Sequence, residues 1–249
     1  MQKDFVGCYI KLFSELDSTN DYCRELLRKE DVREGTVIRA INQRKGRGLS
    51  GNVWESAKGK NLTFSIILHP WFLEPSAQFS LSMAVSLGIS DFLKKQAGEV
   101  SVKWPNDILA GEKKIAGILI ENSIMDNRLE YSVVGIGINI NQTYFPKHIP
   151  NPVSLRQLSG SVHSTDRCMN IVCREIDKWY SRLKKGGGEV VRAAYTEKLF
   201  RLNTESSFRN AGGEFTGIVR GVDNFGRLTL EMVNGEMKHY NLKEVEFVI

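Results

Sequence analysis

The chain has 249 residues, a formal net charge of +5, 41% hydrophobic residues and 25% charged residues, a composition typical of globular proteins. Acidic residues are interspersed with the lysines and arginines, which favours a small phosphate-bearing ligand or an acidic protein partner over a nucleic-acid groove. No apolar run approaches the ~20 residues of a membrane helix, and the N-terminus lacks the apolar core of a secretory signal. Because the four cysteines show no C-x-x-C spacing, we expect reduced cysteines in a cytoplasmic protein without membrane association.

Helix and strand patterns alternate along most of the chain. A helix is expected to begin at the sequence DSTN, where Ser18 lies three residues before Asp21 and can cap the first turn. A second helix at 76–98 has a broad apolar face, and two more are expected at 164–183 and 189–200. Strand-like runs lie at 36–41, 61–68, 100–104, 115–121 and 129–140. These patterns predict an α+β fold with a mixed sheet and helices.

The pattern changes near Thr204. From there on, short alternating segments are separated by turn sequences such as DNFG and NGE, which is typical of a small β-barrel. We therefore expect a domain boundary near Leu202. The predicted domains are a main domain at 1–202 and a C-terminal barrel at 203–249.

A glycine-rich loop follows the first predicted strand of the sheet. In the sequence QRKGRGLSGNVWES, residues 43–56, Gly46, Gly48 and Gly51 have the order G-x-G-x-x-G of dinucleotide-binding loops. That function requires a helix after the glycines, but the chain continues into a second strand without a helical period. The sequence therefore argues against a nicotinamide site, although a loop that carries Arg47 can still enclose an anionic ligand with its backbone amides.

Four other short stretches contain candidate functional residues, and each also has a purely structural explanation. Ser18 and Thr19 in DSTN can be helix caps, and KWPNDI can be a strand that ends at a proline before a turn. Lys114 in KKIAGILIE can be a charge at a strand edge, and the glycines of VVGIGININ, 133–141, can serve close packing.

Taken together with the glycine loop, these stretches resemble the catalytic domain of the biotin protein ligases, in the same order and over nearly the whole chain. KWPND is the most specific of these motifs. The resemblance implies a class II synthetase/biotin ligase-like catalytic domain followed by a small SH3-like β-barrel. The ligase-like sequence begins by about Tyr9, so we expect the monofunctional type, without an N-terminal helix-turn-helix and without DNA binding.

The activity that the resemblance implies has two steps. Biotin attacks the α-phosphate of ATP, with Mg²⁺, to give biotinyl-5′-AMP, and a lysine of a biotin carboxyl carrier protein then takes the biotinyl group. Such carriers belong to biotin-dependent carboxylases such as acetyl-CoA carboxylase. Two anions meet in the first step, so a fixed cation is required. We expect Lys114 to supply it, with Arg47 and Asp107 as the other catalytic residues and Asp107 as the candidate magnesium ligand.

The resemblance also implies the residues that hold each substrate. Those expected to bind biotin are Ser18, Thr19, Asn20, Gln43, Gly46, Arg47, Gly48, Leu49, Lys114, Gly117, Gly135 and Gly137. Those expected to bind the adenylate are Trp54, Lys103, Asn106 and Asn139. The segment 145–155 has the place of the loop that covers the adenine.

The chain departs from the family pattern at two positions of the glycine loop. Many members have arginines where this chain has Leu49 and Asn52, so the hold on the adenylate phosphate is expected to be different. Two alternatives to a biotin ligase remain open: a lipoate-protein ligase, which shares the scaffold, and a biotin- or nucleotide-sensing protein without turnover. The oligomeric state cannot be read from the sequence, and a homodimer remains open.

Overall fold

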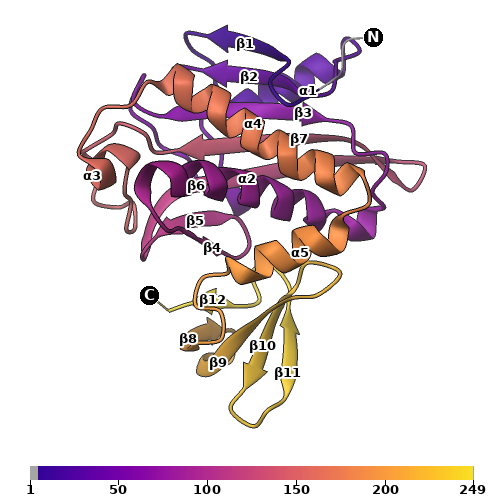
Figure 1. Ribbon diagram of the computed structural model, residues 1–249, viewed down its shortest axis with the longest axis vertical. Coiled ribbons are helices and arrows are strands. Elements are labelled where there is room, and N and C mark those ends of the chain that lie inside the picture. Colours follow the sequence, from indigo (N-terminus) through magenta and orange to yellow (C-terminus); the bar gives the residue numbers. More distant parts are fainter. Residues whose placement is uncertain (1–4, 249) are drawn as a thin grey trace.

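The computed structural model describes residues 5–248 and contains a large mixed sheet and a small antiparallel sheet (Figure 1). The seven strands of the large sheet have the order β1-β2-β3-β7-β6-β5-β4. β1 and β2 are parallel, and the other neighbours are antiparallel. The bounds of these strands are β1 Tyr9–Phe13, β2 Thr36–Ala40, β3 Leu62–Leu68, β4 Ser101–Lys103, β5 Asp107–Ala110, β6 Lys113–Met125 and β7 Arg128–Ile138.

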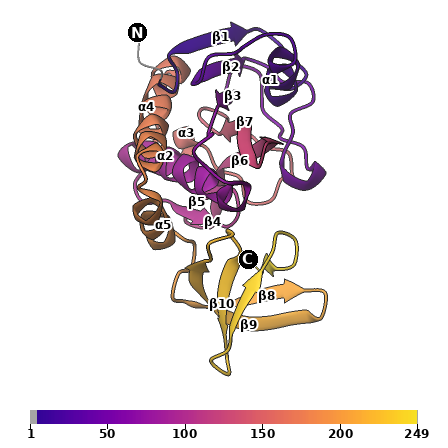
Figure 2. The same ribbon diagram turned by 90° about the vertical axis from the view of Figure 1, so that its right-hand side faces the viewer.

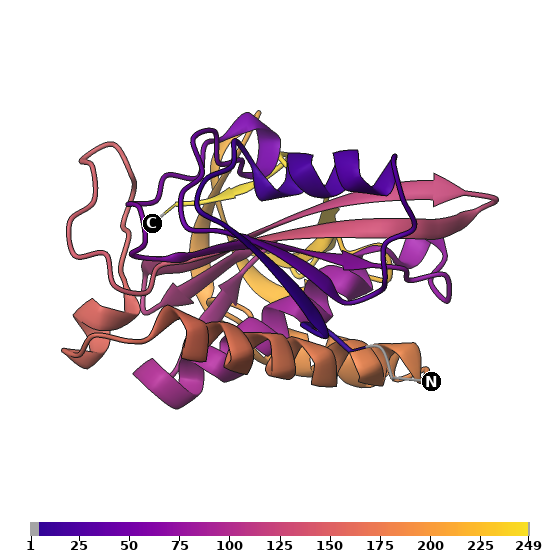
Figure 3. The same cartoon turned by 90° about the horizontal axis from the view of Figure 1, so that it is seen from above.

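Helices cover both faces of the large sheet. Viewed from above, the sheet lies between α1 on one side and the long helices α2 and α4 on the other (Figure 3), and the side view shows the same layers (Figure 2). Gly88 of α2 permits this packing, since a Cβ there would lie 2.6 Å from the Cα of Ile176 in α4. The bounds of the helices are α1 Thr19–Leu27, α2 Phe79–Ala97, α3 Leu155–Ser159, α4 Thr165–Lys184 and α5 Gly188–Glu197, with short 3-10 turns at Leu49–Gly51 and Pro75–Ala77.

Neighbouring residues of the central strands belong to different cores. Val37 and Ile66 pack in the main core with α2 and α4, whereas Ile38 and Ile67 pack against Cys23 of α1. This follows from the alternation of side chains along a strand. Because both faces are covered, every residue of β2 and β3 is buried. Burial raises the pKa of the Cys23 thiol to about 12, which identifies it as a packing residue.

The small sheet has the order β11-β10-β9-β8-β12 and is consistent with an SH3-like domain (Figure 1). Its core includes Phe208, whose ring centre lies 5.0 Å from that of Phe247. A buried hydrogen bond of 2.9 Å from Trp104 Nε1 to the Gly226 carbonyl joins it to the large sheet. The bounds of its strands are β8 Glu205–Asn210, β9 Gly213–Val222, β10 Leu228–Met232, β11 Met237–Tyr240 and β12 Glu246–Phe247.

The predicted α+β class is confirmed, and several elements differ in detail. The predicted strand at 100–104 is shortened to β4, and KWPNDI also contains the start of β5, which was not predicted. The runs at 115–121 and 129–140 form one long hairpin, and α3 is an additional short helix. The boundary between 202 and 203 stays a prediction. Within residues 5–248, no helix is long and apolar enough to cross a membrane.

Candidate active site

A cavity opens between the start of α1, the glycine loop and the centre of the large sheet. The loop covers the strands β6 and β7, whose glycines leave room above the sheet. Most of the predicted site residues meet here. The cavity is lined by Ser18, Thr19, Asn20, Gln43, Arg47, Gly48, Leu49, Ser50, Asn52, Val53, Trp54, Phe64, Asn106, Asp107, Lys114, Gly117, Ile118, Leu119, Gly135, Ile136 and Gly137.

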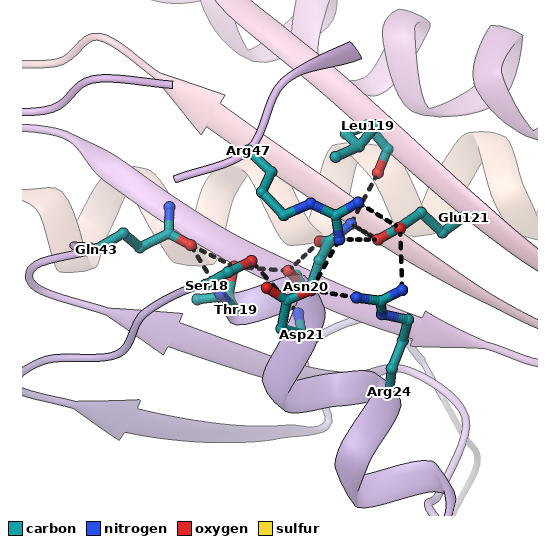
Figure 4. Close-up of polar contacts among 10 residues, drawn as sticks. Ser18, Thr19, Asn20, Asp21, Arg24, Gln43, Arg47, Leu119 and Glu121 are labelled. Carbon is teal, nitrogen blue, oxygen red and sulfur yellow. Dashed lines mark hydrogen bonds and ion pairs between the residues drawn. The ribbon is translucent and has the colours of Figure 1, made fainter. Parts of the chain in front are cut away.

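One end of the cavity is polar, and its groups already bond to one another, with the paired charges of Arg47, Asp21 and Glu121 beside them (Figure 4). Ser18 caps α1 by accepting a hydrogen bond from the Asp21 amide. The backbone amide of Thr19 donates to Gln43 Oε1 at 2.7 Å, and the Thr19 hydroxyl donates to the same oxygen at 3.1 Å. Ser65, which the sequence did not single out, lies 2.7 Å from the Thr19 hydroxyl. Such fixed donors and acceptors suit a neutral polar ring inside a partly apolar pocket.

Asn20 completes this polar end of the cavity, and its side chain is the reason for a glycine at position 135. Its Oδ1 lies 2.6 Å from Ser65 Oγ, and its Nδ2 donates to Glu121 at 2.8 Å. A Cβ on Gly135 would lie only 2.3 Å from Asn20 Oδ1. Gly135 is therefore needed because the Asn20 side chain lies directly on the strand.

Trp54 covers the other two glycines of the sheet. Gly117 and Gly137 are paired across β6 and β7. A Cβ on Gly137 would lie 2.2 Å from Trp54 Cε2, and a Cβ on Gly117 would lie 3.0 Å from Trp54 Cζ3. These glycines were expected to let the strands approach a ligand, and in the structure they accommodate the indole ring. The indole Nε1 of Trp54 is buried and has no hydrogen-bond partner among the described residues.

The opposite end of the cavity is charged. Lys114 Nζ lies 2.7 Å from Asp107 Oδ1 and 5.6 Å from the centre of the Trp54 ring. Asn106 donates to the Ile118 carbonyl at 3.0 Å, which holds the turn before Asp107 against β6. The structure thus joins KWPNDI and KKIAGILIE, because β5 pairs directly with β6. An ammonium beside a carboxylate at the mouth of a polar cavity can bind the anionic part of a ligand.

The structure does not bring the Arg47 side chain to Lys114. Arg47 NH1 lies 2.8 Å from Asp21 Oδ1, and its NH2 lies 3.1 Å from Glu121 Oε1 (Figure 4). Lys114 Nζ lies 3.5 Å from the position of a Cβ on Gly117. Glu121 is four residues beyond Gly117 along β6, a distance of roughly 13 Å at the rise of a strand. The two predicted catalytic cations therefore lie near opposite ends of the cavity.

Two predicted residues near the turns of the site lie outside the cavity lining. Gly46 turns the loop, since its carbonyl accepts from the Trp54 amide at 3.0 Å and a Cβ would lie 2.3 Å from the Trp54 carbonyl. Asn139 is buried, and its side chain donates to the Val153 carbonyl at 3.1 Å. Because Val153 donates to the Lys114 carbonyl, Asn139 supports the strand that carries Lys114.

Lys103 also lies outside the lining. It pairs with Asp107 in the β4–β5 register, and its Nζ lies 5.8 Å from the centre of the Phe247 ring in the small sheet. Burial lowers the pKa of Lys103, and the nearby Asp107 charge opposes that shift. Its predicted contact with the adenylate stays a prediction.

Several lining residues were missed by the sequence analysis. Phe64, Ile118, Leu119 and Ile136 also border the cavity, and nothing in their strand patterns distinguishes them from core residues, since Phe64, Ile118 and Ile136 belong to the main core. Glu121, which bonds to the lining residues Asn20 and Arg47, is the last residue of the motif KKIAGILIE, and this position is a sequence signal for it. Among the described residues 5–248, no group of three or more His, Cys, Asp or Glu side chains is placed to hold a metal ion.

Comparison with known proteins gives a consistent family. Residues 12–139 match the model of the Biotin/lipoate A/B protein ligase family. The bifunctional ligase/repressor BirA of Bacillus subtilis is 30% identical over 246 residues, covering 97% of this chain and 75% of that protein. The biotin–[acetyl-CoA-carboxylase] ligase of Paracoccus denitrificans is 28% identical over 228 residues, covering 88% of this chain and 92% of that one.

The fold agrees with these sequence matches. The solved structure of the biotin protein ligase from Aquifex aeolicus in complex with biotin and ATP has a TM-score of 0.81 to this chain at 27% identity. The alignment covers 97% of this chain and 100% of that one. From its sequence and fold, the chain belongs to the biotin/lipoate A/B protein ligase family.

Proposed function

We propose that the protein is an ATP-dependent biotin ligase, which activates biotin as biotinyl-5′-AMP and transfers it to a lysine of a biotin carboxyl carrier domain. The observation that carries this proposal is the cavity itself, which has uncharged hydrogen-bonding groups at one end and the Lys114–Asp107 pair at the other. A biotin molecule has the same polarity, with a neutral ureido ring and a carboxylate tail. Relatives named as biotin ligases support the proposal.

Lys114 has a clear task in the first step. A carboxylate oxygen of biotin attacks the α-phosphorus of ATP, a new P–O bond forms, and pyrophosphate leaves. Two anions about 4 Å apart repel each other by about 4 kcal/mol at an effective dielectric constant near 20, which is close to a thousandfold in rate. The ammonium of Lys114, at the charged end of the cavity, would contact both the carboxylate and the phosphate and so offset this repulsion.

In the second step the neutral amine of the carrier lysine attacks the carbonyl carbon of biotinyl-5′-AMP. An amide bond forms, the bond from that carbon to the phosphate oxygen breaks, AMP leaves with the electron pair, and the attacking nitrogen loses one proton to water. The Lys114 ammonium stabilises the departing phosphate in the same way as in the first step. The chain thus needs one cation for both reactions.

The donor set is compatible with magnesium bound to ATP. Mg²⁺ is usually held by one or two carboxylates together with substrate phosphates and waters. Asp107 supplies one carboxylate at the charged end of the cavity, and Asn106 is beside it. Asp107 would hold the magnesium ion, which would neutralise phosphate charge when bound.

The two alternatives predict other features. The dithiolane of lipoate has no N–H or carbonyl group with which to use the polar side chains of Thr19, Gln43 and Asn20, whereas the ureido ring of biotin has both. A sensor without turnover has no need for a cation between two anions. Biotin ligation accounts for both ends of the cavity.

The experiment is transfer to a carrier. Purified protein is incubated with MgATP, a biotin carboxyl carrier domain and either biotin or lipoate, and the carrier is analysed by intact-mass spectrometry. We expect the mass increase of one biotinyl group with biotin and none with lipoate. Modification with lipoate alone would indicate a lipoate ligase, and no modification with either acid would contradict ligation.

Three further expectations stay predictions. They are a location in the cytoplasm, a lack of DNA binding, and a carrier domain as the protein partner, while the oligomeric state stays open. All four cysteines are free, which favours a reducing compartment.

A further inference from the structure

The glycine loop, residues 43–56, is held at its two ends by contacts of Arg44 and Lys45 with Asp17 and of Glu55 with His148. Within the loop, Gly48 donates to the Asn52 carbonyl at 2.7 Å, and Trp54 donates to the Gly46 carbonyl at 3.0 Å. The Trp54 ring attaches one side of the loop to β6 and β7. On the other side, the side chain of Arg47 attaches the segment 46–54 to α1 and β6 (Figure 4).

Arg47 lies between two carboxylates from different elements. Asp21 belongs to the first turn of α1, and Glu121 belongs to β6. Arg24 also contacts both acids, so that two arginines and two acids form one charge-balanced group. Burial opposes the charge of Arg47, but Glu121 and Asp21 outweigh it and raise the pKa of the guanidinium. Arg47 therefore stays charged and paired.

We infer that Asp21 and Glu121 are positioning residues, which hold the glycine loop over the bound ligand through Arg47. This inference rests on the proposed function. It assigns to Asp21 and Glu121 the retention of biotinyl-5′-AMP between the two steps. Arg47 is the only charged residue in the sequence from 46 to 54, since Leu49 and Asn52 are uncharged. No other ion pair within that segment can therefore keep the loop closed.

Glu121 also connects loop closure with the polar end of the cavity. It accepts a hydrogen bond from Asn20 Nδ2, and Asn20 in turn contacts Ser65. Glu121 thus has two effects, whereas Asp21 contacts the loop only through Arg47. The substitution Asp21→Asn tests the loop alone, and Glu121→Gln removes the charge but keeps an oxygen that Asn20 can bond.

The test measures dissociation of synthetic biotinyl-5′-AMP, which needs no turnover. The complex of each variant is mixed with excess unlabelled ligand, and release is followed over time. We expect dissociation about fivefold faster for Asp21→Asn and about tenfold faster for Glu121→Gln, since partly exposed ion pairs are weak individually and act mainly on dissociation. The matched control Glu214→Gln breaks the surface pair with Arg209 and is expected to leave the rate unchanged.

Two further readouts separate positioning from a general structural effect. The double variant Arg47→Gln, Asp21→Asn should dissociate no faster than Arg47→Gln alone, because Asp21 acts through Arg47. Asp21→Glu keeps the charge and should restore slow dissociation. The rate of adenylate formation at saturating substrates should stay within twofold of the wild type for Asp21→Asn, since Asp21 does not line the cavity.

The outcomes distinguish this inference from the proposed function. Wild-type protein that does not bind biotinyl-5′-AMP at all would refute the proposed function, and the inference with it. Tight binding with an unchanged dissociation rate in Asp21→Asn would refute the role of the ion pairs and leave the ligase function standing. If Glu121→Gln fails to fold, as judged by its melting curve, the result for Asp21→Asn decides alone.

Discussion

Lys114→Ala gives the sharpest test of the chemistry at the charged end of the cavity. The side chains of Lys114 and Asp107 are 32% and 21% exposed, so their charges act through a dielectric constant near the value of about 20 for protein surfaces. One ammonium about 4 Å from a developing anion is then worth about 4 kcal/mol, and exposure to water reduces this. We therefore expect Lys114→Ala to lose roughly 2–4 kcal/mol of transition-state stabilisation, which lowers the rate of adenylate formation about 30-fold to 1,000-fold.

Removal of Lys114 has a second consequence. The Asp107 carboxylate loses its partner at 2.7 Å and adds its own repulsion to that between the substrates. Lys114→Arg retains the charge and should retain more activity than Lys114→Ala.

The assay is single-turnover formation of biotinyl-5′-AMP, followed by quench and chromatography. Lys113→Ala is the matched control, because Lys113 is adjacent and exposed and does not line the cavity. Its rate should equal that of the wild type. A rate for Lys114→Ala within threefold of the wild type, with a normal melting temperature, would refute the role of this lysine.

Three other substitutions test the geometry of the site. Leu49→Arg places a cation in the loop and should slow dissociation of biotinyl-5′-AMP roughly tenfold, about 1.4 kcal/mol; an unchanged or faster rate would show that a missing charge does not limit retention. Gly137→Ala puts a Cβ 2.2 Å from Trp54 Cε2, so calorimetry should show adenylate affinity reduced at least tenfold; wild-type affinity would mean that the ring is free to move. Gln43→Ala leaves the Thr19 amide without its partner, so the KM for biotin should rise about tenfold to 100-fold while the KM for ATP stays constant; equal changes in both would contradict a biotin-side position.

The sequence predicted those parts of the site that depend on local pattern. Ser18 was expected to cap a helix, and it does so through a hydrogen bond to the Asp21 amide. Lys114 and Asp107 lie on neighbouring strands of a hairpin, so short-range pairing brings their motifs together. The resemblance supplied the wider grouping of residues that are distant in sequence, such as Thr19 and Gln43.

Long-range side-chain contacts could not be predicted in this way. The sequence offers Arg47 many acidic partners, and the choice of Asp21 and Glu121 depends on where α1 crosses the sheet. The glycines of β6 and β7 were associated with a ligand in the sequence analysis. No sequence rule shows that Trp54 lies over them, so this contact was not predicted. The hydrogen bond from Asn139 to Val153 depends on the path of the loop before α3, and the expected contact of Asn139 with the adenylate stays a prediction.

Biotin-dependent exchange of pyrophosphate into ATP is the most direct test of the central claim that the cavity activates biotin. The protein is incubated with ATP, Mg²⁺ and labelled pyrophosphate, with biotin, with lipoate, or without either acid. The account predicts label in ATP only when biotin is present, and its loss in Lys114→Ala but not in Lys113→Ala. Exchange that requires lipoate, or no exchange by folded protein with any acid, would contradict it.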